Sequence, residues 1–391
     1  MAVLFATVAV KTSRDTERKE PLVRVVVIGA GIIGAAVAAG LTRRGAQVTL
    51  LEERFPGAGT TGTSFAWVNA RNKEPEPYFT LNHAAVHAHH ALEGGGFVAT
   101  GHLECATGDA HLAELLARVE RLRDREYAVE RITAGRAVSL EPGLATQPDG
   151  TEYVLFPEEG HVFPALLLAR FLGEARDGGA RVEIGAAARE IKSNAGGVTV
   201  ILDDGGMRVA DIVVACAGRW TDLLVDVPML DPRVSGAVTN GFLVTTTAVP
   251  ARLSRVLTTD RLNMRPDGAG RLLMQALDLD GAADPDLPPG DEIGGEMLAR
   301  LPDVLTATDG TRVEQARVGQ RAIPADGLTV AGFTDPAARV YVVATHSGIT
   351  LAPLLADLVA AEVLGKESAL LGPFRPGRFS AAVTTGPALQ A

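Results

Sequence analysis

The chain has 391 residues, of which 47% are hydrophobic and 21% charged, and its formal net charge is −10. A chain of this length is too long for one ordinary hydrophobic core, so we expect two structural domains. The composition excludes a disordered or fibrous protein. The negative charge argues against general binding to nucleic acid, and two cysteines are too few for a disulfide framework, which fits the reducing cytoplasm where we expect the protein.

The chain begins with an apolar run, Met1–Val10, followed by the charged run Lys11–Glu20. A secretory signal has the reverse order, with basic residues first. The run is also shorter than the roughly twenty apolar residues that span a bilayer. We therefore interpret residues 1–22 as an N-terminal extension, and we expect no transmembrane segment anywhere in the chain.

A strand, a helix and a second strand are predicted directly after this extension. Val23–Ile28 is a β-branched run typical of a buried parallel strand, and the glycine-rich segment Gly29–Gly34 turns the chain. Ala35–Arg44 has the pattern of a helix of small residues. Gln47–Leu51 is a second strand that ends at Glu52. This βαβ unit of about thirty residues is typical of the start of a doubly wound sheet.

The remaining pattern mixes amphipathic helices with short strands. Helices are predicted at Ala110–Arg125, Ala165–Arg176 and Leu351–Leu364. Strands are predicted at Val182–Ile184, Val198–Leu202, Asp211–Ala215, Gly241–Thr247, Arg271–Leu277 and Val340–Ala344. Asp278–Glu292 is so rich in Pro, Gly and Asp that we expect a surface loop there.

The glycine turn has the Gly-X-Gly-X-X-Gly spacing that binds a dinucleotide pyrophosphate. Gly29 permits the tight turn, Gly31 lets the backbone approach the phosphates, and Gly34 lets helix and strand pack closely. The helix N-terminus offers free N–H groups to the phosphates. Glu52 ends the second strand, where a carboxylate accepts hydrogen bonds from a ribose. These features do not separate FAD from NAD.

Six markers in order along the chain carry a family resemblance that separates the two cofactors. They are the glycine turn with Glu52, the polar segment Gly59–Ser64, Leu140–Pro142, the strand into Ala217–Gly218, and two C-terminal motifs, Gly319–Gly327 and Ala344–Pro353. With these markers the chain resembles the D-amino acid oxidase/glycine oxidase family of FAD enzymes from about Val23 to Phe379. The family also includes sarcosine oxidases and 2-hydroxyglutarate dehydrogenases.

The resemblance implies FAD as the cofactor. We expect non-covalent attachment, because the Gly59–Ser64 loop has no histidine and the C-terminal part has no cysteine. The expected cofactor-binding residues are Gly29, Gly31, Ile32, Ile33, Gly34, Glu52, Glu53, Arg54, Thr60, Thr61, Gly62, Thr63, Ser64, Ala188, Ala217, Gly218, Trp220, His346, Ser347, Gly348, Ile349 and Thr350.

The substrate site implied by the resemblance centres on arginine. Arg321 stands where glycine oxidase binds the substrate carboxylate, and Arg265 is the second candidate. The alternative for Arg321 is a surface arginine paired with Asp326. His346 is a candidate catalytic base, although a structural, hydrogen-bonding histidine is the favoured interpretation. The second carboxylate-binding arginine of glycine oxidase is absent.

No metal site is predicted. His83 and His87 lie one helical turn apart, and His89 and His90 follow, but neither an HExxH pattern nor a nearby cysteine completes a zinc motif. We interpret these four histidines as a solvated helical face.

We predict an α/β fold with a Rossmann-like, three-layer FAD-binding domain and a mixed or antiparallel-sheet substrate domain. The FAD domain gathers residues 23–72, 158–224 and 325–379, and the substrate domain gathers 73–157 and 225–324. The resemblance implies oxidation of the C–N bond of an amino acid or secondary amine by hydride transfer to flavin N5, with O₂ or another acceptor reoxidising the flavin. A 2-hydroxy acid dehydrogenase, an NAD-dependent dehydrogenase and a non-catalytic FAD-binding subunit remain alternatives.

Overall fold

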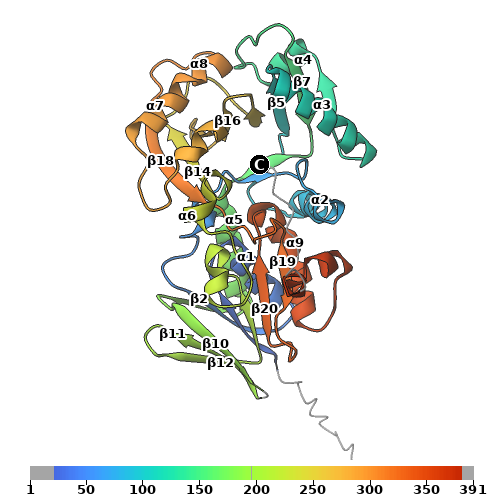
Figure 1. Cartoon of the computed structure of the whole chain (residues 1–391), viewed down its shortest axis with the longest axis vertical. Coiled ribbons are helices and arrows are strands. Elements are labelled where there is room, and N and C mark those ends of the chain that lie inside the picture. Colours follow the sequence, from blue (N-terminus) through green and yellow to red (C-terminus); the bar gives the residue numbers. More distant parts are fainter. Residues whose placement is uncertain (1–21, 195, 381–391) are drawn as a thin grey trace, which may run out of the picture.

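The computed structural model describes residues 22–194 and 196–380. The predicted N-terminal extension, apart from Leu22, therefore lies outside the described residues. Two lobes are visible in Figure 1, the lower one built on a six-stranded sheet and the upper one on an eight-stranded sheet. Within the described ranges, no helix is both long enough and apolar enough to cross a lipid bilayer.

The six-stranded sheet forms the centre of the lower lobe. Its order is β19 (Val330–Phe333), β20 (Val340–Ala344), β13 (Ile212–Ala215), β1 (Arg24–Ile28), β2 (Gln47–Glu52) and β9 (Arg181–Ile184). All neighbours are parallel except β19 and β20. Successive side chains of β1 point to opposite faces, so Val25 and Val27 enter one core and Val26 and Ile28 another. Burial on both faces explains the continuous β-branched run.

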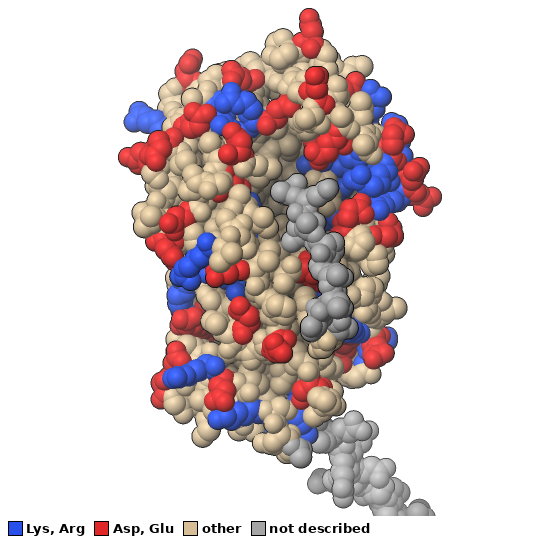
Figure 2. Space-filling model, viewed as in Figure 1, with Lys and Arg blue, Asp and Glu red and all other residues tan. Residues whose placement is uncertain are grey.

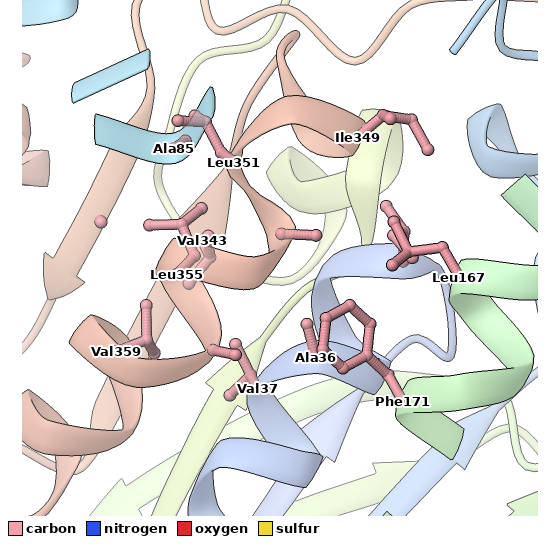
Figure 3. Packing of buried hydrophobic residues seen from close by; sticks show 14 of the residues in the cluster. Ala36, Val37, Ala85, Leu167, Phe171, Val343, Ile349, Leu351, Leu355 and Val359 are labelled. Atoms are coloured by element: carbon pink, nitrogen blue, oxygen red, sulfur yellow. The ribbon is translucent and has the colours of Figure 1, made fainter. Parts of the chain in front are cut away.

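Helices cover one face of this sheet. They are α1 (Ile32–Arg43), α2 (Glu76–Ala91), α5 (Pro164–Asp177) and α9 (Gly348–Val363). Figure 3 shows Val37 of α1 beside Leu355 and Val359 of α9, with Phe171 of α5 next to Ala36. Each fully buried aliphatic side chain of this kind contributes roughly 1.5–3 kcal/mol of transfer free energy.

Helix α2 belongs to this layer although its residues fall in the segment predicted for the substrate domain. Its buried side chains Tyr78, Leu81 and Val86 join the core formed by α1 and α9. His89 is also buried, so the predicted solvated histidine face of this helix is wrong at that position.

A three-stranded antiparallel meander covers the opposite face of the six-stranded sheet. It consists of β10 (Ala188–Asn194), β11 (Gly197–Leu202) and β12 (Met207–Ala210). Val198 and Val200 pack against Val26 and Ile28 of the central sheet. Helices, parallel sheet and meander form three layers, which confirms the predicted fold class.

The upper lobe is built on the eight-stranded sheet. Its order is β18 (Val313–Gln320), β14 (Asn240–Thr246), β17 (Leu272–Gln275), β16 (Asn263–Pro266), β15 (Val256–Thr258), β5 (His102–Ala106), β7 (Glu152–Phe156) and β6 (Glu130–Ile132). The pairs are antiparallel except β15 with β5. The helices of this lobe are α3 (Asp109–Asp124), α4 (Ala134–Leu140), α6 (Pro232–Ser235), α7 (Asp291–Ala299) and α8 (Leu301–Val304).

A small sheet connects the two lobes. It contains β3 (Trp67–Val68), β8 (Gly160–Val162) and β4 (Phe97–Val98). On the face shown in Figure 2, acidic and basic side chains are interspersed.

The predicted surface loop Asp278–Glu292 is only partly irregular. Residues Leu277–Ala282 form a 3₁₀ helix, η4, and α7 begins at Asp291. Asp280 is 2% exposed. Its carboxylate accepts a hydrogen bond from the backbone N–H of Phe242. Aspartate usually indicates an exposed loop, but this one forms a buried hydrogen bond.

The crossing of α1 and α9 yields a stability prediction. A Cβ added at Gly40 would lie 1.8 Å from the backbone oxygen of Ala356, so the two helices would have to separate. We expect Gly40→Ala to cost about 1–3 kcal/mol or more and to lower the melting temperature at a fixed FAD concentration by several degrees. Gly173 in α5 is the matched control, since a Cβ there meets nothing within 4 Å. An equal effect of Gly173→Ala would contradict the close crossing.

Candidate functional site

A cavity of about 400 Å³ lies at the carboxyl ends of β1, β2, β13 and β20, the edge of a doubly wound sheet where ligands bind. It is lined by Ile28, Gly29, Gly31, Ile32, Ile33, Leu51, Glu52, Glu53, Arg54, Ala58, Gly59, Thr60, Thr61, Ser64, Ala186, Ala188, Cys216, Ala217, Gly218, Trp220, Leu223, Leu224, Ala322, Thr345, His346, Gly348 and Ile349. We call this the first cavity.

The glycine turn brings backbone to the wall of the first cavity. Gly29 has φ +95°, and a Cβ there would meet the backbone oxygen of Cys216 at 2.6 Å. A Cβ at Gly34 would lie 1.9 Å from the oxygen of Gly29, so helix α1 can begin this close to the turn only without a side chain. Gly31 faces the cavity beside Thr61. The three glycines therefore leave a cradle that fits a pyrophosphate against the start of α1.

Glu52 and Thr61 hold the cradle in place. One carboxylate oxygen of Glu52 accepts the backbone N–H of Ala30 at 2.9 Å, and the other accepts the N–H of Arg54 at 2.9 Å. The hydroxyl oxygen of Thr61 accepts the N–H of Ile32 at 3.0 Å, in the first turn of α1. Thr61 therefore caps a helix whose N-cap residue is a glycine without a side chain.

The turn between β20 and α9 forms one wall of the first cavity, and hydrogen bonds on its other side fix its position. The Thr345 hydroxyl accepts the N–H of Ser347, and the Ser347 hydroxyl lies 2.9 Å from that of Tyr78. His89 donates its Nε2–H to the backbone oxygen of Ile349 at 3.0 Å. Burial lowers the pKa of His89 to about 4, so the ring is neutral at neutral pH. Helix α2 thus holds the N-terminal turn of α9 rigidly against the cavity.

A second, larger cavity of about 850 Å³ opens beyond this turn. Thr60, Ser64, His346 and Ile349 line both cavities and mark their junction. The far side of the second cavity is formed by the eight-stranded sheet and η4. A planar group that extends from the first cavity would therefore present one face to the second.

Arg321 lines the second cavity and is partly engaged by protein. Its Nη2 pairs with Asp280 at 3.0 Å. Its Nη1 donates to the backbone oxygens of Ala237, Val238 and Asn240. The Nε–H makes no hydrogen bond to any described residue, so it remains available to an anion in the cavity. Burial raises the pKa of Asp280, while the Phe242 N–H and Arg321 act in the opposite direction.

Lys73 carries the positive charge of the second cavity that lacks a counterion. The four arginines of its lining, Arg71, Arg118, Arg261 and Arg321, each pair with a carboxylate. Lys73 has no ion-pair partner among residues 22–194 and 196–380; its ammonium lies over the ring of Tyr78, 5.7 Å from the centroid. An anion entering this cavity would therefore neutralise an otherwise uncompensated charge.

His346 lies at the junction of the two cavities. Its side chain is exposed within the cavities. Desolvation by the surrounding protein nevertheless lowers the pKa of the ring to about 3, and the positive charges of Lys73 and Arg321 act in the same direction. The ring is therefore neutral at neutral pH and a weak base. It forms no hydrogen bond to another residue in the described ranges, which leaves both ring nitrogens available to a ligand.

An ionic network forms the wall opposite Arg321. Glu104 is 1% exposed and forms ion pairs with Arg71, Arg118 and His111. Despite burial, these positive neighbours lower the pKa of the Glu104 carboxyl. His111 also contacts Asp260 at 3.0 Å, and the Glu104 hydrogen bond raises the pKa of His111. The network is internally neutralised, which distinguishes it from Lys73.

Most of the expected cofactor residues meet at these cavities. Thr63, Ser347 and Thr350 line only the second cavity, whereas Gly34 and Gly62 line neither. The N–H of Gly62 bonds the oxygen of Gly57 within the loop. The lining residues of the first cavity that were not among the expected cofactor residues are mostly small or apolar, and their types carry no chemical signal: Ile28, Leu51, Ala58, Gly59, Ala186, Cys216, Leu223, Leu224, Ala322 and Thr345.

The two candidate anchors are placed differently. Arg265 lines neither cavity and is 1% exposed; its guanidinium donates to the backbone oxygens of Phe65 and Pro266 and pairs with Asp267. It is part of the protein wall, and the structure gives it no route to a substrate. The alternative for Arg321 also fails, because Asp326 pairs with Arg378 at 2.6 Å.

Comparisons with known proteins agree with this geometry. Residues 24–362 match the family described as FAD dependent oxidoreductase. The chain is 26% identical to glycine oxidase from Bacillus licheniformis over 362 residues, 87% of this chain and 92% of the relative. Among solved structures, glycine oxidase from Geobacillus kaustophilus has a TM-score of 0.79 at 24% identity, covering 91% of this chain and 99% of that one.

A second solved structure of the same fold is iminodiacetate oxidase from Chelativorans sp. BNC1, with a TM-score of 0.75 at 23% identity, covering 90% of this chain and 99% of that one. The family match spans most of the chain and includes both cavities. The chain therefore belongs to the FAD-dependent oxidoreductase family, and its cofactor is FAD.

Proposed function

We propose that the protein oxidises the C–N bond of an amino acid or a related secondary amine, with FAD in the first cavity and the substrate in the second. The observation that carries the proposal is the junction at His346, where the flavin site opens directly onto a cavity with Arg321 and Lys73 in its wall. Glycine oxidases among the relatives and an iminodiacetate oxidase among the structural neighbours support this reaction class.

In this proposal FAD is held without a covalent bond. The cradle of Gly29, Gly31 and the start of α1 takes the pyrophosphate, and Glu52 takes the adenosine ribose. Ser64 and the turn at Gly348, which line the first cavity, would hold the isoalloxazine ring near the junction. The N-terminus of α9 there stabilises negative charge on the ring. When bound, FAD supplies the hydride acceptor, its N5 atom.

The protein's own task is to hold the substrate. Arg321 donates hydrogen bonds to the substrate carboxylate. Because Asp280 already neutralises the charge of Arg321, Lys73 supplies the positive charge that balances the substrate. A carboxylate bound there has its Cα–H next to the flavin junction, so positioning provides much of the rate enhancement. His346, neutral and unpaired, serves as a hydrogen-bonding group for the substrate amine rather than as a strong base.

Three further assignments belong to the same proposal. O₂ or another acceptor reoxidises the flavin. The FAD domain gathers residues 23–72, 158–224 and 325–379, with α2 added because it packs on α9. A cytoplasmic location is supported by Cys105 and Cys216, which are both free and buried.

The proposed ribose carboxylate can be tested by Glu52→Gln. An amide nitrogen cannot accept the backbone N–H that one oxygen of Glu52 now accepts, and the ribose loses a charged acceptor. We expect FAD affinity to fall at least about tenfold, the effect of losing a hydrogen bond to a charged group. Flavin fluorescence titration of the apoprotein measures this. Glu367→Gln is the control, because Glu367 is exposed and lines neither cavity, so this variant should bind FAD normally; equal losses in both variants would contradict the role of Glu52.

The carboxylate anchor can be tested by Arg321→Ala. Loss of the guanidinium leaves a desolvated carboxylate unpaired, at a cost on the order of 2–5 kcal/mol, or roughly 30- to several-thousand-fold in kcat/KM. Arg321→Lys should recover only part of this, because it restores charge without the fork. Lys73→Met should lower kcat/KM about tenfold, chiefly through KM.

Arg261→Ala is the control for this series, since Arg261 lines the same cavity but its side chain is 61% exposed. Anaerobic flavin bleaching with a panel of amino acids and secondary amines identifies the substrate and gives the reduction rates. Wild-type reduction by Arg321→Ala at low substrate concentration would refute the anchor. All variants should retain the flavin absorption near 450 nm.

Non-covalent attachment has a direct test. Precipitation of the holoprotein with acid should release all flavin into the supernatant. Yellow colour retained in the washed pellet would show a covalent bond and overturn this part of the proposal.

A further inference from the structure

Two histidines and a glutamate meet outside the cavities, between α2 and the turn that joins β7 to β8. His83 and His87 lie one turn apart on α2, and their ring centroids are 4.6 Å apart. Glu158, in the turn, places Oε2 3.7 Å from Nε2 of His83. One ligand atom from each of the three residues lies within 4.8 Å of the other two. None of these residues takes part in the proposed oxidation.

The distances suit a shared ion better than a hydrogen bond. A separation of 3.7 Å is too long for a hydrogen bond, and Nε2 of His83 is buried with no hydrogen-bond partner among the described residues. In a tetrahedral site with metal–ligand bonds near 2.0–2.1 Å, ligand atoms stand about 3.4 Å apart. The His83–Glu158 pair is close to this value, and rotation of the exposed His87 side chain closes the remaining distance.

The surroundings hold the ligands in place. The ring of His83 packs against those of Phe79 and Tyr127, with centroids 5.3 and 5.0 Å away. His90, on the next turn of α2, donates Nε2–H to the backbone oxygen of Glu158 at 2.8 Å. This bond ties the glutamate's turn to the helix and limits the movement of its carboxylate.

We propose that His83, His87 and Glu158 bind one divalent transition-metal ion, with Zn²⁺ the best match to two imidazoles and one carboxylate. Water completes the coordination. The ion links α2 to the turn between β7 and β8. Its role is structural, since His87 is exposed and the site opens to solvent rather than to either cavity.

The test is calorimetric titration of ZnCl₂ into tag-free holoprotein that has been treated with chelator and dialysed. We expect one ion per chain with a dissociation constant in the micromolar range or tighter, and a higher melting temperature with Zn²⁺ present. His87→Ala and Glu158→Gln should each weaken binding at least about tenfold while the flavin spectrum stays unchanged. Excess Mg²⁺ should not compete, because Mg²⁺ prefers oxygen ligands.

Glu93→Gln is the matched control, because Glu93 is exposed just beyond the end of α2 and its carboxylate has no partner among the described residues. Wild-type affinity in this variant supports the assignment. Absence of Zn²⁺ binding to the wild-type holoprotein, or binding retained in both His87→Ala and Glu158→Gln, would overturn it. The result is independent of the proposed oxidation, since it is read from binding and not from turnover.

Discussion

Helix α1 lies so close to its neighbours that no side chain fits at two of its positions. Gly34 meets the backbone of the turn before the helix, and Gly40 meets the backbone of α9. This double contact places the N-termini of α1 and α9 on one cavity, each with unpaired N–H groups and the positive end of a helix dipole. The crossing of α1 and α9 therefore determines where the cofactor site lies and where it meets the second cavity.

The turn at the start of α9 also has to be held in place, and contacts from α2 do this. Tyr78 and His89, eleven residues apart on one face of the helix, hold Ser347 and Ile349 from the side opposite the cavity. On the substrate side, Thr60 donates its hydroxyl to the backbone oxygen of Gln320, next to Arg321. The Gly59–Ser64 loop and the strand that precedes Arg321 are therefore fixed to each other, as the proposed positioning of a substrate within a fraction of an ångström requires.

Local sequence patterns predicted the parts whose chemistry is local. The βαβ unit, the glycine turn and Glu52 follow from strand, turn and helix signals within thirty residues, and the structure confirms them as elements. Asp280 could not be found this way, because its carboxylate is explained by partners 38 and 41 residues away. His89 had a signal that went unused: it continues the buried face of Tyr78, Ala85 and Val86 at helical spacing. The lone charge of Lys73 becomes visible only when the arginines of the second cavity are matched with their carboxylates in three dimensions.

The ion pair between Arg321 and Asp280 has a consequence for the resting enzyme. A bare guanidinium in a half-enclosed cavity would attract chloride, phosphate and other small ions that are abundant in cells, and each would have to leave before turnover. The built-in carboxylate removes most of the long-range attraction that Arg321 would exert, while its Nε–H stays unpaired among the described residues. A small inorganic ion then gains mainly the charge of Lys73, whereas a carboxylate can also bond Arg321, so the pair favours a carboxylate over inorganic competitors.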